Sequence, residues 1–161
     1  MVNTIDTRDE KFMRAAINEA KKAALIGEVP IGAVICKGDE VIAAAHNRRE
    51  TDRNALAHAE IPAIDIACRK LGGWRLHECE LFVTLEPCAM CAGAIINARI
   101  KRVVFGAFDP KAGSFGSVVN LAELPYNHHP LIAGGILEAD CGRLLTDFFA
   151  QLRKNKVSCC D

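Results

Sequence analysis

A histidine, a glutamate and two cysteines stand in two short groups, His58-Ala59-Glu60 and Cys88-Ala89-Met90-Cys91. Imidazole and thiolate groups are ligands that zinc prefers in proteins, and a closed structural zinc site uses four of them. Three ligands, from His58, Cys88 and Cys91, leave one position open for water, which is typical of a catalytic zinc. Glu60 would then transfer the protons of that water. The two groups together predict a hydrolytic zinc site.

Two other interpretations of the cysteines stay open at this point. A Cys-x-x-Cys pair is also the motif of thiol redox proteins. A structural zinc site would need a fourth ligand, and the chain has further cysteines that could supply it: Cys36, Cys68, Cys79 and Cys141. Glu60 alone could also be an acidic residue that complements a helix dipole. We favour the catalytic site because the His-x-Glu group accompanies the cysteine pair.

The length of 161 residues suits one domain over residues 1–161, with a folded core at about 9–156. Twenty basic and twenty acidic residues give a formal net charge of zero, so any nucleic-acid binding must come from a local patch. Residues 1–11 are polar and lack the apolar segment of a secretory signal. No uncharged stretch is long enough to span a bilayer. We therefore expect a cytoplasmic protein with reduced cysteines and no membrane partner.

Hydrophobic periodicity predicts an alternation of helices and strands. Apolar residues at helical spacing predict helices at 9–25, 58–71, 87–97 and 138–156, with a short one near 118–123. Apolar and β-branched runs predict strands at 31–37, 40–46, 80–85, 102–106 and 131–134, and loops at 47–56 and 109–117. The first two strands flank Lys37-Gly38-Asp39 as a hairpin. This alternation indicates an α/β sandwich around a mixed or parallel sheet.

The predicted elements place the chemical groups close together. Cys88 and Cys91 are three residues apart at the start of a helix, so both face the same way. The helix dipole at that end stabilises thiolates, the form that binds zinc. His58 stands at the start of the preceding helix, so two helix N-termini could converge on the metal. Glu60 points in another direction and would stand beside the metal without ligating it.

Further blocks of sequence surround the metal motif. They are 27–33 (Gly-Glu-Val-Pro-Ile-Gly-Ala), 45–47, 58–61, 81–94, 102–107, 109–111, 116–117, 127–128, 135–137 and 147–149. The pattern His-x-Glu with Pro-Cys-x-x-Cys is the signature of zinc-dependent base deaminases. With these blocks, from about Lys11 to Arg153, the chain resembles the bacterial tRNA-specific adenosine deaminases of the cytidine deaminase superfamily. The zinc motif is common to the superfamily, whereas the flanking blocks point to the tRNA branch.

The resemblance implies a cytidine deaminase-like fold, a three-layer α/β/α sandwich around a mixed sheet of about five strands. It implies one Zn²⁺ per subunit, a homodimer, and hydrolysis of adenosine to inosine at the wobble position of a tRNA anticodon. Zinc-activated hydroxide would attack the base, with Glu60 as the proton shuttle. The expected partner is the anticodon stem-loop of an arginine tRNA, whose flipped-out base would lie over zinc beneath residues 29–33.

Family positions that contact the substrate correspond to two groups of residues here. The base-pocket positions are Val29, Pro30, Ile31, Asn47 and Ala59, and the positions for the anticodon loop and its flanking nucleotides are Asp109, Lys111, Asn127, His128, Phe149 and Arg153. Asn47 could instead be a turn residue after a strand, and Arg153 a solvated helix end. One of Phe148 and Phe149 is expected to pack in the core.

The chain departs from the family pattern at two places, which bear on tRNA recognition and leave the zinc chemistry untouched. Asn54-Ala55-Leu56 stands where many relatives have Asp-Pro-Thr, and His129 stands where many have arginine. Two alternative functions follow from the same residues. One is a deaminase of free guanine or another small nucleobase or nucleotide, and the other is a scaffold protein without catalysis. The intact Glu60 speaks against the scaffold, because a binding protein needs no proton shuttle.

Overall fold

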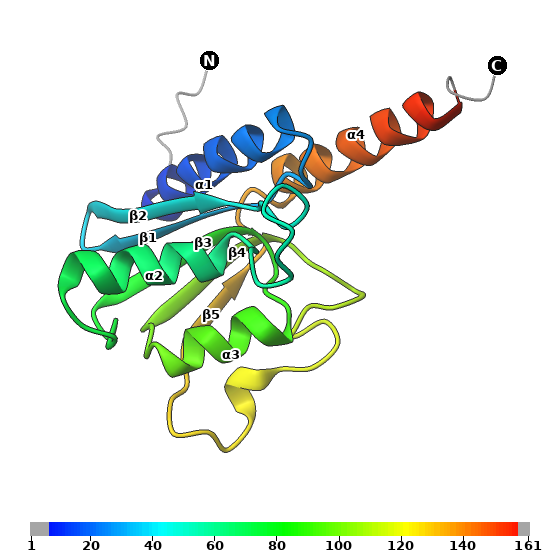
Figure 1. Ribbon diagram of the computed structural model, residues 1–161. Coiled ribbons are helices and arrows are strands. Elements are labelled where there is room, and N and C mark those ends of the chain that lie inside the picture. Colours follow the sequence, from blue (N-terminus) through cyan, green and yellow to red (C-terminus); the bar gives the residue numbers. More distant parts are fainter. Residues whose placement is uncertain (1–6, 158–161) are drawn as a thin grey trace, which may run out of the picture.

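The computed structural model describes residues 7–157, which form a five-stranded mixed sheet with helices on both faces (Figure 1). The strands are β1 (Gly32–Lys37), β2 (Glu40–His46), β3 (Cys79–Leu85), β4 (Arg102–Ala107) and β5 (Leu131–Gly134), in the order β2-β1-β3-β4-β5. β1 runs antiparallel to both of its neighbours, whereas β3, β4 and β5 are parallel. The predicted mixed sheet of about five strands is confirmed.

Four α-helices complete the two outer layers. α1 (Arg8–Leu25) and α4 (Glu138–Val157) cover one face, and α2 (Glu60–Leu71) and α3 (Ala89–Asn97) cover the other (Figure 1). A short 3-10 helix, η1 (Leu121–Glu123), precedes β5. The three-layer α/β/α sandwich is therefore confirmed. Within residues 7–157, no helix combines the length and the apolar character needed to cross a bilayer.

The middle residues of the central strands β3 and β4 are buried on both faces, which explains the consecutive apolar residues at 81–83 and 103–105. Along β3, Leu81 and Val83 pack under α2 and α3, while the side chain between them, Phe82, packs under α1 and α4. Phe12 of α1 meets Phe82 with ring centroids 5.2 Å apart. The two hydrophobic clusters thus share the sheet as their common wall, and the sheet fixes α2 and α3 relative to each other.

Two helices begin two residues later than the sequence predicts, and both differences fall at the functional motifs. α2 begins at Glu60. The backbone N–H of His58 donates to the carbonyl of Leu56 at 2.9 Å, which places His58 in a tight turn before the helix. α3 begins at Ala89, because Cys88 is extended, with ψ of 174°, and caps the helix. His58 and Cys88 therefore stand just outside their helices and project from the helix starts.

An ion pair ties the start of α1 to the sheet and gives a pH-dependent prediction. Arg102 donates to both carboxylate oxygens of Asp9, at 2.9 and 2.6 Å, and these hydrogen bonds lower the pKa of Asp9 from its ordinary 3.8. A lowered pKa stabilises the fold above the ordinary value, and this contribution disappears as the pH falls through the lowered pKa. Asp9→Asn should therefore cost about 1 kcal/mol of unfolding free energy near neutral pH.

Urea unfolding of the native protein and of Asp9→Asn, at a pH well above 3.8 and at a pH below the lowered pKa of Asp9, measures this difference. The matched control is Asp39→Asn, an exposed acid that pairs with Arg8 and should change stability little at either pH. A deficit of Asp9→Asn that persists unchanged in acid would contradict the assignment.

Candidate active site

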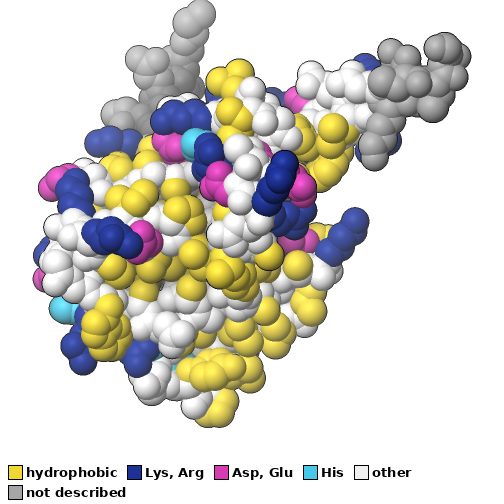
Figure 2. All heavy atoms as spheres, viewed as in Figure 1, with side chains coloured by type: hydrophobic (Ala, Val, Ile, Leu, Met, Phe, Trp, Pro, Cys, Tyr) yellow, Lys and Arg dark blue, Asp and Glu magenta, His cyan; other side chains and the backbone are white. Residues whose placement is uncertain are grey.

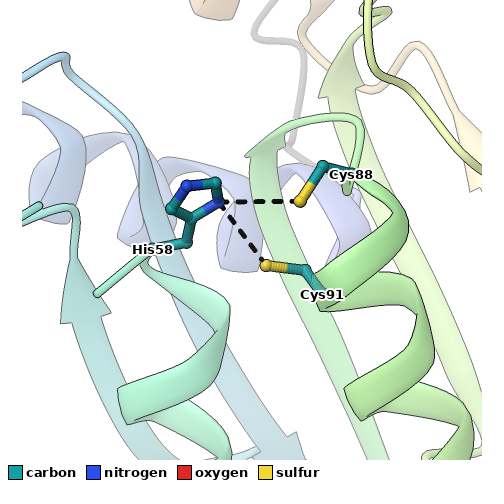
Figure 3. A group of neighbouring side chains, drawn as sticks. All are labelled: His58, Cys88 and Cys91. Carbon is teal, nitrogen blue, oxygen red and sulfur yellow. Dashed lines mark hydrogen bonds between the residues drawn. The ribbon is translucent and has the colours of Figure 1, made fainter. Parts of the chain in front are cut away.

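The three predicted metal ligands converge at one end of the sheet, between the starts of α2 and α3 (Figure 3). Nδ1 of His58 lies 3.6 Å from Sγ of Cys88 and 3.7 Å from Sγ of Cys91. The three donor atoms all lie within 4.8 Å of one another. His58 is 30 residues before Cys88 and 33 before Cys91 in the chain, yet the three side chains form one compact group of nitrogen and sulfur donors.

The two cysteines differ in their protonation. Hydrogen bonds with the Cys91 side chain and with His58 outweigh burial and lower the pKa of Cys88 to about 3. The hydrogen bond with Cys88, together with burial, raises the pKa of Cys91, and the contact with Cys88 raises the pKa of His58. The contacts with Cys91 and with the imidazole therefore favour the thiolate form of Cys88, which is the form that binds zinc.

The donor set fits a zinc ion. Two sulfurs and one imidazole nitrogen are ligands that favour zinc over the hard cations Mg²⁺ and Ca²⁺, which prefer oxygen. Cys36, Cys68, Cys79 and Cys141 lie outside the group, so within residues 7–157 the cluster comprises three donors only. A fourth-cysteine structural site is thus not formed here, and an open position remains in the donor set.

Glu60 lies beside this group in the first turn of α2. Its side chain is only 4 % exposed, and burial raises the pKa of its carboxyl. The carboxyl also hydrogen-bonds with Cys91, so it stands next to the donors without joining them. A carboxyl with a raised pKa beside a metal site is suited to accept a proton and to return it.

A cavity of about 230 Å³ opens over the donors. Of the residues predicted for the substrate pocket, Val29, Ile31, Asn47 and Asp109 line it. Its other lining residues are Arg49, His58, Glu60, Leu85, Glu86, Cys88 and Ala112. The walls are therefore mainly apolar, with polar groups at a few fixed points, as in sites for small organic groups. A larger cavity of about 450 Å³ lies between α1 and α4 and contains none of the metal donors.

Two residues predicted for the base pocket lie elsewhere. Ala59 is fully buried at the start of α2, where it packs in the core under the sheet. Pro30 lines a separate groove between α1 and α4, together with Phe148. The segment 29–31 thus passes between two hollows, and its successive side chains alternate between them.

Asn47 is fixed in the cavity wall by its neighbours. Its side-chain amide donates to Glu28 at 3.4 Å and to the carbonyl of Val29 at 3.3 Å, and its oxygen accepts from the backbone of Arg49 at 3.3 Å. Glu28, 1 % exposed, also accepts from the backbone N–H of Thr51 at 2.5 Å. The hydrogen bond from the backbone N–H of Arg49 to the Asn47 oxygen is a local turn contact. Asn47 therefore stabilises the turn and also lines the cavity.

The residues predicted to contact the anticodon loop lie around the cavity or away from it, and none except Asp109 lines it. Lys111 is exposed in the loop between Asp109 and Ala112, two lining residues. Asn127 is exposed, and Nε2 of the half-buried His128 lies 2.7 Å from the carbonyl oxygen of Ile100. Phe149 and Arg153 are exposed on α4, and Phe149 meets Phe148 edge to face with centroids 5.5 Å apart. Phe148 is half-buried and Phe149 is exposed, so neither is fully buried in the core, as was expected of one of them.

Sequence reasoning did not assign roles to two buried carboxylates at the cavity, Glu28 and Glu86. Both are nearly inaccessible, at 1 % and 2 % exposure, and both accept several hydrogen bonds. The signal was present, because each is a charged residue directly before apolar residues of a buried segment. A buried carboxylate requires partners, and most of these partners are backbone N–H groups, which a sequence does not display.

The surface around the site carries mixed charge. On the face drawn in Figure 2, Lys and Arg side chains are scattered among acidic ones, while hydrophobic side chains gather over the lower half of the molecule. Part of that apolar area belongs to the segment around η1, where Val118 is 60 % and Tyr126 48 % exposed. In α3, by contrast, Ala92, Ile95 and Ile96 are buried in the chain's own core, whereas Ala89 is exposed and Met90 and Ala94 are half-buried.

Comparison with known proteins places the chain among deaminases. Residues 7–153 match the family model of the MafB19-like deaminases. The chain is 54% identical, over 151 residues, to the tRNA-specific adenosine deaminase of Bacillus subtilis (strain 168). The matched region covers 93% of this chain and 94% of that protein.

Two solved structures are similar in fold. One comes from a study of A-to-I editing by tRNA:A34 deaminases at the wobble position of transfer RNA. It has a TM-score of 0.81 and 45% identity, and covers 84% of this chain and 99% of the other. The guanine deaminase of Bacillus subtilis has a TM-score of 0.60 and 41% identity over 62% of this chain and 64% of its own.

Proposed function

The chain belongs to the MafB19-like deaminase family and is 54% identical to a tRNA-specific adenosine deaminase, and we propose that it hydrolyses the wobble adenosine of a tRNA anticodon to inosine. The observation that carries this proposal is the single cavity in which His58, Cys88 and the buried Glu60 meet. The expected tRNA is an arginine tRNA, and the enzyme acts where tRNA is found, in the cytoplasm.

His58, Cys88 and Cys91 would hold Zn²⁺, one ion per subunit. When bound, zinc lowers the pKa of a coordinated water from about 15.7 to near 7 and so supplies a nucleophile at neutral pH. Glu60 is the group of this chain that moves protons. Its carboxylate accepts one proton from the attacking water and delivers it to the purine ring. It then takes the remaining proton from the hydroxyl group added at C6 and delivers it to the leaving amine, so the carboxylate ends the cycle ionised, as it began.

The reaction balances as adenosine plus water giving inosine plus ammonia. A carbon–oxygen bond forms at C6 of the base, and the bond from C6 to the exocyclic nitrogen breaks. The apolar walls, Val29, Ile31 and Leu85, keep bulk water from the base, and Asn47 presents polar atoms to its edge. A cavity of about 230 Å³ suits one base, so the target nucleotide must leave its stack to enter.

The deciding experiment measures inosine formed by zinc-loaded protein from an arginine-tRNA anticodon stem-loop with a wobble adenosine. Free adenosine, cytidine and guanine are assayed in parallel. We expect conversion of the stem-loop and none of the free compounds. Activity on guanine alone would keep the zinc chemistry and reject the RNA substrate, whereas a zinc-loaded protein that releases no ammonia from any of them would be a scaffold.

Lys111 gives a second test of RNA as the substrate. Its side chain is exposed in the loop at the cavity rim, where a phosphate of the RNA would lie beside it. Lys111→Ala should raise KM for the stem-loop and reduce the slope of log KM against log salt concentration by about 0.7, the value for one phosphate contact in a single strand. The matched control is Lys37→Ala, an exposed lysine at the opposite end of β1 that pairs with Glu78. An unchanged salt slope in Lys111→Ala would remove this residue from the RNA interface.

We also propose that the active protein is a homodimer of single-domain subunits that use the apolar surface near η1. Val118, Val119, Leu124 and Tyr126 are exposed within nine residues of the chain, and contiguous exposed apolar area marks contact surfaces in many proteins. Light scattering coupled to gel filtration gives the mass. A monomer at assay concentration would reject the dimer without affecting the proposed reaction.

A further inference from the structure

We propose that Glu86 is a positioning residue for RNA binding, because its buried carboxylate fixes the 109–117 loop against the segment that carries Cys88. This inference rests on the proposed function, since the loop matters only if its residues receive RNA.

The Glu86 carboxylate is almost entirely engaged by this one loop. One oxygen accepts from the backbone N–H of Asp109 at 3.0 Å and from the hydroxyl of Ser117. The other accepts from the backbone N–H groups of Phe115, at 3.1 Å, and Ser117, at 3.0 Å. The donors lie at both ends of the loop, so a single side chain closes it. Glu86 itself is only 2 % exposed.

The middle of the loop packs directly on the same carboxylate. A Cβ placed on Gly113 would overlap the Glu86 carboxyl group, so the loop approaches as closely as a glycine allows. Next to it, the backbone N–H of Ser114 donates to the carbonyl of Pro87 at 2.8 Å, and Gly113 pairs with Cys88 in an antiparallel bridge. The loop is therefore attached to residues 86–88 along its length.

This attachment connects substrate recognition to the metal donors. Asp109 and Ala112 line the cavity beside Cys88, and Lys111 stands between them. Asp109 in turn accepts from the backbone N–H groups of Lys111 and Ala112, at 3.0 and 3.3 Å, which shapes the rim of the cavity. Because both Glu86 oxygens already accept two hydrogen bonds each, the residue serves by holding the loop and not by reacting with the base.

Glu86→Gln tests the proposal with little change in shape. The glutamine keeps one acceptor oxygen. If its amide nitrogen faces Asp109 and Ser117, the Ser117 hydroxyl can turn to accept from it, but the buried backbone N–H of Asp109 loses its acceptor. We expect KM for the stem-loop to rise about 10- to 100-fold, with kcat changed less than about threefold and zinc content unchanged. A parallel loss of kcat and zinc would place Glu86 in the metal site and overturn the positioning role.

A double mutant separates positioning from a general loss of structure. If Glu86 acts through the loop, Lys111→Ala should raise KM in the native protein but add little in Glu86→Gln, because Lys111 is already displaced. The matched control is Glu80→Gln, a half-buried carboxylate of β3 that pairs with Arg102 and should leave KM unchanged. Fully additive effects of Glu86→Gln and Lys111→Ala would contradict the proposal.

Two further measurements keep the inference testable if Glu86→Gln folds poorly or if the stem-loop is not a substrate. Ser117→Ala removes one hydroxyl donor and should raise KM less than Glu86→Gln does. Limited trypsin digestion needs no substrate, and cleavage after Lys111 should be faster in both variants than in the native protein. Unchanged cleavage would reject the role of Glu86 in holding the loop, whereas faster cleavage without stem-loop activity would reject only the proposed function.

Discussion

Glu60→Gln is expected to lower kcat for inosine formation by about 10³- to 10⁴-fold while the protein stays folded and keeps its zinc. Proton transfer by a positioned side chain contributes about 10²- to 10⁴-fold to a reaction, and Glu60 is used for more than one transfer in each turnover. Glutamine has the same shape but cannot accept and return a proton. Inosine release under single-turnover conditions and zinc content by elemental analysis measure the two effects.

The burial of Glu60 explains why this substitution should spare the fold. The side chain is 4 % exposed, and an ionised carboxylate is costly to bury, so a neutral amide of equal size is tolerated there. Glu19→Gln is a suitable control, because Glu19 is also nearly buried but faces Lys22 and His46, away from the metal donors. Normal turnover by a zinc-loaded Glu60→Gln protein would rule out the proton-transfer role.

Cys88→Ser is expected to abolish stabilisation by zinc without weakening the fold itself. Ligand that binds only the folded state adds about 2.7 kcal/mol of stability at a free concentration of 100 times its Kd. A serine hydroxyl is not a zinc ligand at neutral pH, so this gain should vanish together with activity. Serine is a favourable helix cap, and residue 88 caps α3, which offsets part of the loss of the hydrogen bonds that Cys88 makes with Cys91 and His58. The metal-free variant should therefore be close in stability to the metal-free native protein.

Thermal unfolding of the native protein and of Cys88→Ser, each with added zinc and with a chelator, gives the four stabilities to be compared. Cys68→Ser is the matched control, since Cys68 is also a half-buried thiol but hydrogen-bonds only with the carbonyl of Trp74. It should keep the full response to zinc. A Cys88→Ser protein that zinc still stabilises as strongly as the native one would remove Cys88 from the metal site.

The fold could be predicted because its determinants are local. The consecutive apolar residues in the middle of β3 and β4 reflect burial on both faces, and the spacing of Phe12, Ala16 and Ala20 reflects one buried face of α1. The starts of α2 and α3 could not be placed from periodicity, because His58 and Cys88 take non-helical positions that depend on their contacts across the site. Helix ends are set by such capping interactions, which periodicity does not contain.

The candidate site could be predicted for the residues whose chemistry is visible in their type. His58, Cys88 and Cys91 do meet, because their spacing places them at two helix starts over the same sheet. The residue-level role of Ala59 in a base pocket was inferred from resemblance, and the structure buries this residue in the core instead. Glu86 was missed because its partners are the backbone amides of a loop more than twenty residues away.

The metal donors and Glu60 stand at the starts of two helices held by the sheet, whereas Lys111, Asn127 and Phe149 stand on loops and on the exposed side of α4. These two sets of residues therefore depend on different parts of the fold. A substitution at an exposed rim residue leaves the donors in place, so the rim can be redesigned without rebuilding the metal site. The 109–117 loop is the exception. Because it is hydrogen-bonded to Glu86, a substitution that moves this loop would also move the residues next to Cys88.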